Sequence, residues 1–111
     1  MYNNRMKNKV KKVINILNKE LKEKFPDFKG AYLYGSQAKN TSHKYSDIDM
    51  VALFDTTPNT PKRYEIWEIV CPIEAEYDVF IDLQPMTVEE LNYNQVYYNE
   101  VVNKGIFYDA A

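Results

Sequence analysis

Four residues in the middle of the chain have the types and spacing of a phosphate and metal site. Gly35 and Ser36 follow a short apolar stretch, and Asp47 and Asp49 open the next one. A glycine-serine turn can present backbone N–H groups to phosphate oxygens. Alternate residues of a strand project from one face, so the two carboxylates should lie roughly 6–7 Å apart along the backbone. These parts together could hold a nucleoside triphosphate with its magnesium.

Nucleotidyl transfer needs one more acid. Magnesium takes oxygen ligands, and two ions about 3.5–4 Å apart can clamp the attacking and leaving oxygens. A third carboxylate would complete such a site and accept the proton of the attacking hydroxyl. The strand predicted at 77–86 contains Asp78 and Asp82. Asp78 lies at its start, where capping or solvation costs little. Asp82 lies in its middle, where an unpartnered carboxylate is costly, so we predict that Asp82 is the third acid.

Each half of this pattern has an ordinary structural interpretation when taken alone. Gly35-Ser36 could be a simple turn, and Asp47 to Asp49 could be a polar junction between a loop and a strand. Other phosphate motifs are excluded, because no Gly-Lys-Ser/Thr follows the turn and three glycines cannot supply a dinucleotide fingerprint. The combination, with strands on both sides and a third acid downstream, favours the functional interpretation.

Hydrophobic periodicity predicts the elements that position these residues. In order, they are a helix at 4–25, strands at 30–34 and 47–54, a helix at 62–77, a strand at 77–86, a helical turn opened by Thr87 with Glu90, a helix at 92–104 closed by Gly105, and an extended tail at 106–111. Pro72 predicts a kink or an early end of its helix, and Pro85 ends its strand or places it at a sheet edge. Strands separated by helices predict one α/β (α+β) domain covering residues 1–111.

Composition narrows the classes of function. The 111 residues carry a net charge of −2, which does not predict direct binding of nucleic acid. Lysines on the first helix are interpreted as a solvated face, with contact to RNA or an acidic partner as the alternative. The C-terminal part of the chain is rich in tyrosine. These side chains could pack against the sheet or form a partner surface, because tyrosine is favoured where an apolar region meets solvent; they are Tyr93, Tyr97, Tyr98 and Tyr108.

The single cysteine, Cys71, excludes an internal disulfide and a thiolate metal cluster, and its apolar neighbours predict a buried thiol. The basic start of the chain lacks the apolar segment of a signal peptide, and no apolar run approaches the length of a membrane span. We therefore expect a cytoplasmic protein that does not enter the membrane.

The spacing of Gly35-Ser36, ten further residues and then Asp47-Ile48-Asp49 resembles the signature of the DNA-polymerase-β-like nucleotidyltransferase superfamily. More narrowly, GSQAKNTSHKYSDIDM is similar to the minimal nucleotidyltransferases, the MNT proteins of bacteria and archaea. The similarity continues through DLQPMTVEEL and YYNEVVNKGIFYDAA. One departure is Asn40, which follows Lys39 where the family usually has glycine, and it concerns the loop rather than the acids. The resemblance implies a small mixed β-sheet with helices packed mainly on one face.

The resemblance also implies roles for individual residues. Gly35 and Ser36 would hold the triphosphate of ATP. Apart from the resemblance, Lys39 and Lys44 in the polar loop are placed to meet phosphate charge, with a solvated loop as the alternative interpretation. Asp47 and Asp49 would bind two Mg²⁺ ions, and the acid matching Asp82 would complete the catalytic triad. The reaction would transfer a nucleotide to a hydroxyl acceptor, with pyrophosphate leaving.

The family further implies a biological partner. MNT proteins are commonly encoded with HEPN toxins and act as their antitoxins in a type VII-like pair, in studied members by transferring AMP from ATP to a tyrosine of the toxin. Two alternatives are an antitoxin that acts by occlusion alone, and an enzyme that modifies a small molecule, as antibiotic nucleotidyltransferases do. Self-association and the nucleotide preference are left open.

Overall fold

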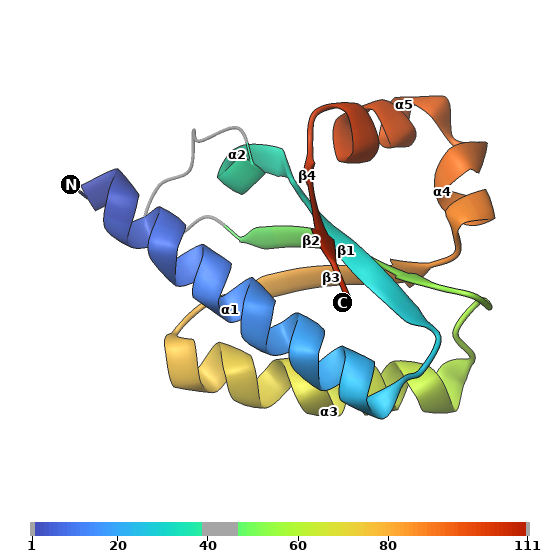
Figure 1. The fold of residues 1–111 in the computed structure, drawn as a ribbon, viewed down its shortest axis with the longest axis horizontal. Helices are drawn as coiled ribbons and strands as arrows, with labels where there is room; N and C mark the ends of the chain where they lie inside the picture. Colours follow the sequence, from blue (N-terminus) through green and yellow to red (C-terminus); the bar gives the residue numbers. More distant parts are fainter. Residues whose placement is uncertain (1, 39–46, 111) are drawn as a thin grey trace.

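The computed structural model describes residues 2–38 and 47–110, which form one mixed four-stranded sheet with helices on both faces (Figure 1). The strand order is β3-β2-β1-β4. The strands are β1 (Phe28–Tyr34), β2 (Ile48–Phe54), β3 (Ile81–Met86) and β4 (Ile106–Asp109). β1 is antiparallel to both β2 and β4, whereas β2 and β3 are parallel. The predicted small mixed sheet is confirmed, and β3 lies at an edge, as Pro85 indicated.

The long helices cover one face of the sheet and a short helical segment covers part of the other (Figure 1). The helices are α1 (Tyr2–Lys24), α2 (Gly35–Ala38), α3 (Thr60–Tyr77), α4 (Val88–Tyr93), α5 (Gln95–Tyr98) and the π-helical turn η1 (Asn99–Asn103). α1 and α3 lie on the first face, as the prediction of helices mainly on one face requires. α4, α5 and η1 lie on the second. No helix in the described ranges is long and apolar enough to cross a membrane.

The apolar run of β2 is explained by burial on both faces. Met50 and Phe54 face the core made with α1 and α3, where the helical stripe that includes Val13 and Leu17 is fully buried. Val51 and its neighbours of the same parity face a smaller second core made with the C-terminal helices. Successive side chains of a strand point to opposite faces, so two cores require an unbroken apolar strand.

α3 differs from its prediction at Pro72. Asn59 caps its start by accepting a hydrogen bond from the Lys62 backbone N–H at 3.0 Å. The helix then continues through Pro72 to Tyr77, so the early end does not occur. Proline removes one backbone hydrogen bond, but buried side chains before and after it hold the helix against the sheet. Asp78, with φ of 53°, ends the helix, and β3 therefore begins at Ile81 rather than at residue 77.

Two α3 side chains that follow buried residues, Cys71 and Trp67, are exposed. The prediction of a buried thiol at Cys71 is wrong, because Cys71 is exposed. A helix turns about 100° per residue, so the position after buried Val70 points away from the core. Trp67 is 59% exposed for the same reason, since it follows buried Ile66.

The C-terminal segment keeps its predicted start and end but not its continuity. The capping box is confirmed: Thr87 Oγ1 accepts from the Glu90 N–H at 3.1 Å, and the Thr87 N–H donates to Glu90 Oε1 at 2.9 Å. The single helix predicted at 92–104 is instead split, because Asn94 is extended and caps α5. The extended tail is confirmed as β4. Tyr97 and Tyr98 pack into the second core, whereas Tyr93 is 92% exposed.

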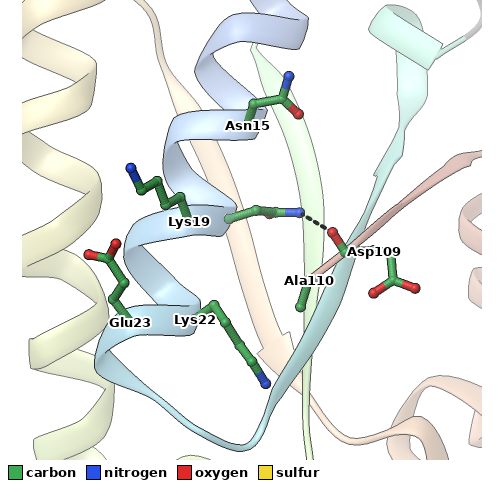
Figure 2. A pocket seen from close by; sticks show the side chains of 7 residues that line it. Asn15, Lys19, Lys22, Glu23, Asp109 and Ala110 are labelled. Atoms are coloured by element: carbon green, nitrogen blue, oxygen red, sulfur yellow. Dashed lines mark hydrogen bonds between the residues drawn. The ribbon is translucent and has the colours of Figure 1, made fainter.

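Asn18 ties α1 to the edge strand β4. Its amide Nδ2 donates to the carbonyl oxygen of Tyr108 at 3.1 Å and lies 3.5 Å from that of Asp109. The residue is buried, and its Oδ1 has no hydrogen-bond partner. Asn18 lines a cavity of about 390 Å³ between the two elements, and Figure 2 shows Asn15 and Lys19 of α1 and Asp109 of β4 around this cavity.

We predict that Asn18→Asp lowers the free energy of unfolding by about 2 kcal/mol, because a carboxylate would face carbonyl oxygens where an amide now donates. Asn15→Asp is the matched control: it makes the same change at an exposed position of α1 and should shift stability by less than about 0.5 kcal/mol. Denaturant unfolding measures both variants. Equal losses in the two variants would contradict the role assigned to Asn18.

Candidate active site

A row of three polar residues crosses the sheet where β1, β2 and β3 lie side by side. The strand registers pair Tyr34 of β1 with Asp49 of β2, and Asp49 with Asp82 of β3. Adjacent strands lie about 4.7–4.9 Å apart, so the two acids are direct neighbours. The parallel pairing of β2 with β3 therefore brings together two of the three acids that the sequence analysis selected.

The carboxylates lie on the face of the sheet opposite α1 and α3. Ile48 and Ile81, which directly precede the two acids, are buried in the core under those helices. Because side chains alternate along a strand, Asp49 and Asp82 project to the other face. Asp49 is partly buried and Asp82 is exposed. Asp47 is exposed and lies just before β2, two residues from Asp49.

The electrostatics of the row confirm that the acids are close together. Burial raises the pKa of Asp49, and the negative charges of Asp82 and then Asp47 raise it further. Burial, the hydrogen bond with Tyr97 and then the charges of Asp49 and Asp82 raise the pKa of Tyr34 well above its usual range. The charges of Asp47 and Asp82 therefore act on Asp49, which places the three carboxylates in one small region.

The glycine turn lies beside the acids. Gly35 has φ of 73°, in the left-handed region that favours glycine, and begins α2. A Cβ on Gly35 would lie 2.6 Å from Asp49 Oδ2, so any side chain there would displace the carboxylate. Ser36 belongs to the same helical turn, which agrees with the predicted turn. Lys39 and Asn40 lie outside the described residues.

The donor chemistry of this region fits Mg²⁺, which prefers carboxylate oxygens from one or two acids together with phosphates and water. Asp49 and Asp82 supply two adjacent carboxylates, and a cation there would offset the burial and the like charges that raise the pKa of Asp49. Among the described residues, no group of three histidine, cysteine or acidic side chains is already arranged to hold an ion. Asp49 and Asp82 are therefore the principal candidates, with Asp47 next to them in the chain.

Two polar neighbours of the acids were missed by the sequence analysis. Tyr34 shares a 3.3 Å hydrogen bond with the hydroxyl of Tyr97 from α5. Gln84 Nε2 donates to Asp82 Oδ1 at 2.9 Å. Alternation along each strand could have indicated Gln84, which has the same parity as Asp82. The Tyr34–Tyr97 pair joins residues 63 positions apart, and only the fold reveals it.

A cavity of about 200 Å³ adjoins Asp82 at the outer side of β3. Its lining includes Arg63 and Trp67 from α3 together with Gln84 and Pro85. The larger cavity at Asn18 contains no residue of the acid row. The smaller cavity borders the edge of the acid row, whereas the carboxylates of Asp49 and Asp82 project from the sheet face opposite α3.

Comparison with known proteins identifies the class. The family profile of the nucleotidyltransferase domain matches residues 14–108, so the chain belongs to this family and is a nucleotidyltransferase. No curated protein sequence matches the chain.

Solved structures place the chain near the MNT proteins, as the sequence resemblance indicated. A mutant MntA–HpeT toxin–antitoxin structure has a chain with 25% identity and a TM-score of 0.60, over 91% of this chain and 70% of that one. A toxin–antitoxin structure with AMP-PNP has a chain with 26% identity and a TM-score of 0.59, over 95% of this chain and 72% of that one. A structure of an AMPylated Shewanella oneidensis HEPN toxin in complex with an MNT antitoxin has a chain with 24% sequence identity and a TM-score of 0.54, over 93% of this chain and 69% of that one. This match shows a likeness of fold.

We predict that Asp49→Asn stabilises the metal-free protein at neutral pH. The pKa of Asp49 is raised in the folded state, so ionisation of this group opposes folding as pH rises through that pKa. The variant removes this penalty, and its advantage should disappear below about pH 4, where the wild-type carboxyl is protonated in both states. Denaturant unfolding in EDTA across this pH range measures the effect.

Glu68→Gln is the matched control, since it removes one negative charge at an exposed position of α3. It should leave the pH dependence of stability unchanged. A loss of stability in Asp49→Asn at neutral pH would mean that the ionised carboxylate holds the fold together, contrary to the repulsion described here.

Proposed function

We propose that this chain transfers AMP from ATP to a tyrosine hydroxyl of a HEPN-type toxin and so acts as the antitoxin of a type VII-like pair. The observation that carries the proposal is the pairing of Asp49 with Asp82 beside the Gly35 turn. A glycine turn next to two paired carboxylates in a nucleotidyltransferase domain supports the roles proposed for them in phosphate and metal binding.

In the proposed reaction, the acceptor oxygen attacks the α-phosphorus of ATP. A bond forms between that oxygen and phosphorus, the bond from phosphorus to the bridging oxygen breaks, and pyrophosphate leaves. Asp82 accepts the proton of the hydroxyl. Two Mg²⁺ ions held by Asp47, Asp49 and Asp82 would supply charge neutralisation on the phosphates. Gly35 and Ser36 seat the β and γ phosphates.

The solved neighbours support the choice of reaction and partner. The mutant structure carries two aspartate-to-glutamate changes two positions apart, which is the spacing of Asp47 and Asp49 in this chain. A neighbour with AMP-PNP supports an adenine nucleotide as substrate. The acceptor proposed here follows from the structure of an AMPylated HEPN toxin in complex with an MNT antitoxin, a structure in which the matched chain has a fold like that of this protein.

Asp82→Asn tests the third acid. It should reduce transfer of label from α-labelled ATP to the HEPN toxin by roughly 10²–10⁴-fold, because the hydroxyl loses its proton acceptor. Asp78→Asn is the matched control. Asp78 is exposed and caps α3, where asparagine also tolerates the left-handed backbone, so activity should persist.

If Asp78→Asn loses activity and Asp82→Asn does not, the third carboxylate is Asp78, and the assignment to Asp82 is wrong. Label on a small molecule instead of the toxin would favour the antibiotic-type enzyme. Inhibition of the toxin by wild-type protein without any label would favour an antitoxin that acts by occlusion.

Magnesium should stabilise the wild-type protein. At about 100 times its Kd, an ion that binds only the folded state adds roughly 2.7 kcal/mol to the free energy of unfolding. The combined variant Asp49→Asn with Asp82→Asn should show no gain, since it lacks the paired carboxylates. Thermal unfolding with Mg²⁺, and with KCl of equal ionic strength, measures the difference. An equal gain from KCl would show screening instead of binding.

A further inference from the structure

The helix α3 carries apolar side chains on its outer face as well as on the face that packs against the sheet. Three side chains of the inner face are buried in the core. On the outer face, Tyr64 and Trp67 are 67% and 59% exposed, and Cys71 and Ala75 are also exposed. These four residues follow one another at intervals of three and four positions, which places them in one line along the helix; we call this line the outer stripe. A helix that is apolar on both sides is usually buried on both sides.

We infer that the outer stripe is a contact surface between two copies of this chain, which pack with their α3 helices antiparallel about a twofold axis. The inference does not depend on the proposed reaction, because α3 covers the sheet face opposite to the one from which Asp49 and Asp82 project. In Figure 1, α3 runs along the lower margin of the molecule, next to α1. The acid rows of both copies would therefore remain on the outside of the pair.

The order of side-chain sizes along the outer stripe favours an antiparallel copy. The two large rings, Tyr64 and Trp67, come first, and the two small side chains, Cys71 and Ala75, come last. Tyr64 and Ala75 lie 11 positions apart, which is about three full turns, so they lie on the same side of the helix. A twofold axis level with the point between residues 69 and 70 would set Tyr64 of one copy opposite Ala75 of the other. It would likewise bring Trp67 next to Cys71, so that each ring packs on a small side chain.

The charges at the two ends of the outer stripe favour the same arrangement. Arg63 lies at its start, where its Nε donates to the carbonyl oxygen of Pro58 at 3.3 Å. Glu74 and Asp78 lie at its end, 11 and 15 positions further on and therefore within about 60° of Arg63 around the helix axis. An antiparallel pair brings Arg63 of each copy near the acids of the other, and such complementarity fixes the register of an interface.

Self-complementarity identifies the partner as a second copy. A twofold interface uses the same surface on both molecules, so each half of the surface must fit the other half. The outer stripe meets this condition in size and in charge. A stripe that binds an unrelated protein does not need it. A parallel pair does not meet it either, because Trp67 would then face Trp67 of the second copy and Arg63 would face Arg63.

Sedimentation equilibrium of the full chain measures the dissociation constant of the dimer. The wild-type protein should dimerise at chain concentrations up to about 1 mM. Trp67→Glu should raise the dissociation constant by at least roughly 10-fold, since it replaces a central aromatic contact with a charge. Tyr93→Glu is the matched control: it makes the same kind of change at a ring of α4 that is 92% exposed on the other face of the sheet, and it should leave the constant unchanged.

Arg63→Ala tests the orientation of the two helices. In the antiparallel pair it removes an attraction to the acids of the second copy, so the dissociation constant should rise. In a parallel pair it would remove a repulsion between two like charges, and the constant would fall. A fall would overturn the antiparallel arrangement.

Cys71 provides a test that changes no ring. It is the only cysteine of the chain and lies close to the expected twofold axis, so a short bis-maleimide should link two wild-type chains. Cys71→Ser should give no linked product, and Trp67→Glu should give much less than wild type. Equal yields from wild type and Trp67→Glu would mean that the links form by random collision, which would overturn the inference.

The remaining outcomes separate this inference from the proposed function. A wild-type chain that stays monomeric at every concentration overturns the inference. If that monomer binds the HEPN-type toxin and Trp67→Glu weakens the binding, the outer stripe is a surface for the toxin and not for a second copy. A wild-type dimer that transfers no AMP to the toxin supports the inference and contradicts only the proposed function.

Discussion

The structure depends on the parallel pairing of β2 with β3, which sets Asp49 directly opposite Asp82. Burial raises the pKa of Asp49, and the like charge of Asp82 at the neighbouring position raises it further, so the pairing has a cost. The pairing persists because Ile48 and Ile81, one residue earlier on each strand, are buried together under α1 and α3. Apolar burial on one face of the sheet thus holds a charged arrangement on the other.

The second face is built to leave this arrangement accessible. The C-terminal helices bury Val51 and Leu91 in a small core, and Tyr97 reaches Tyr34 at the end of β1. That contact brings a hydroxyl pair to the border of the acid row without covering Asp82, which stays exposed. The glycine turn completes the border, because any side chain at Gly35 would collide with Asp49.

The two edges of the sheet have different characters. At β4, Asn18 of α1 satisfies backbone carbonyl oxygens and joins the helix to the strand. At β3, Pro85 lacks a backbone donor, and α3 borders the edge with Trp67 and Arg63. The edge next to the acids is therefore bordered by an aromatic ring and a positively charged side chain.

Local sequence was sufficient for features that depend on neighbours in the chain. Local geometry explains three of these features: the two-residue spacing of Asp47 and Asp49, the capping box of Thr87 and Glu90, and the tendency of Pro85 to end a strand or lie at a sheet edge. The fold class could also be predicted from the sequence, because hydrophobic periodicity and the GS…DID pattern do not depend on the details of side-chain packing.

Long-range packing decided the rest. The sequence contains both Asp78 and Asp82, but only the strand register puts Asp82 beside Asp49, while Asp78 caps a helix. Periodicity alone did not distinguish Val70 from Cys71, because the helix orientation against the sheet determines which side chain is buried. Pro72 inside α3 was tolerated for the same reason. Pairings such as Tyr34 with Tyr97 join distant parts of the chain, and their geometry exists only once the sheet has assembled.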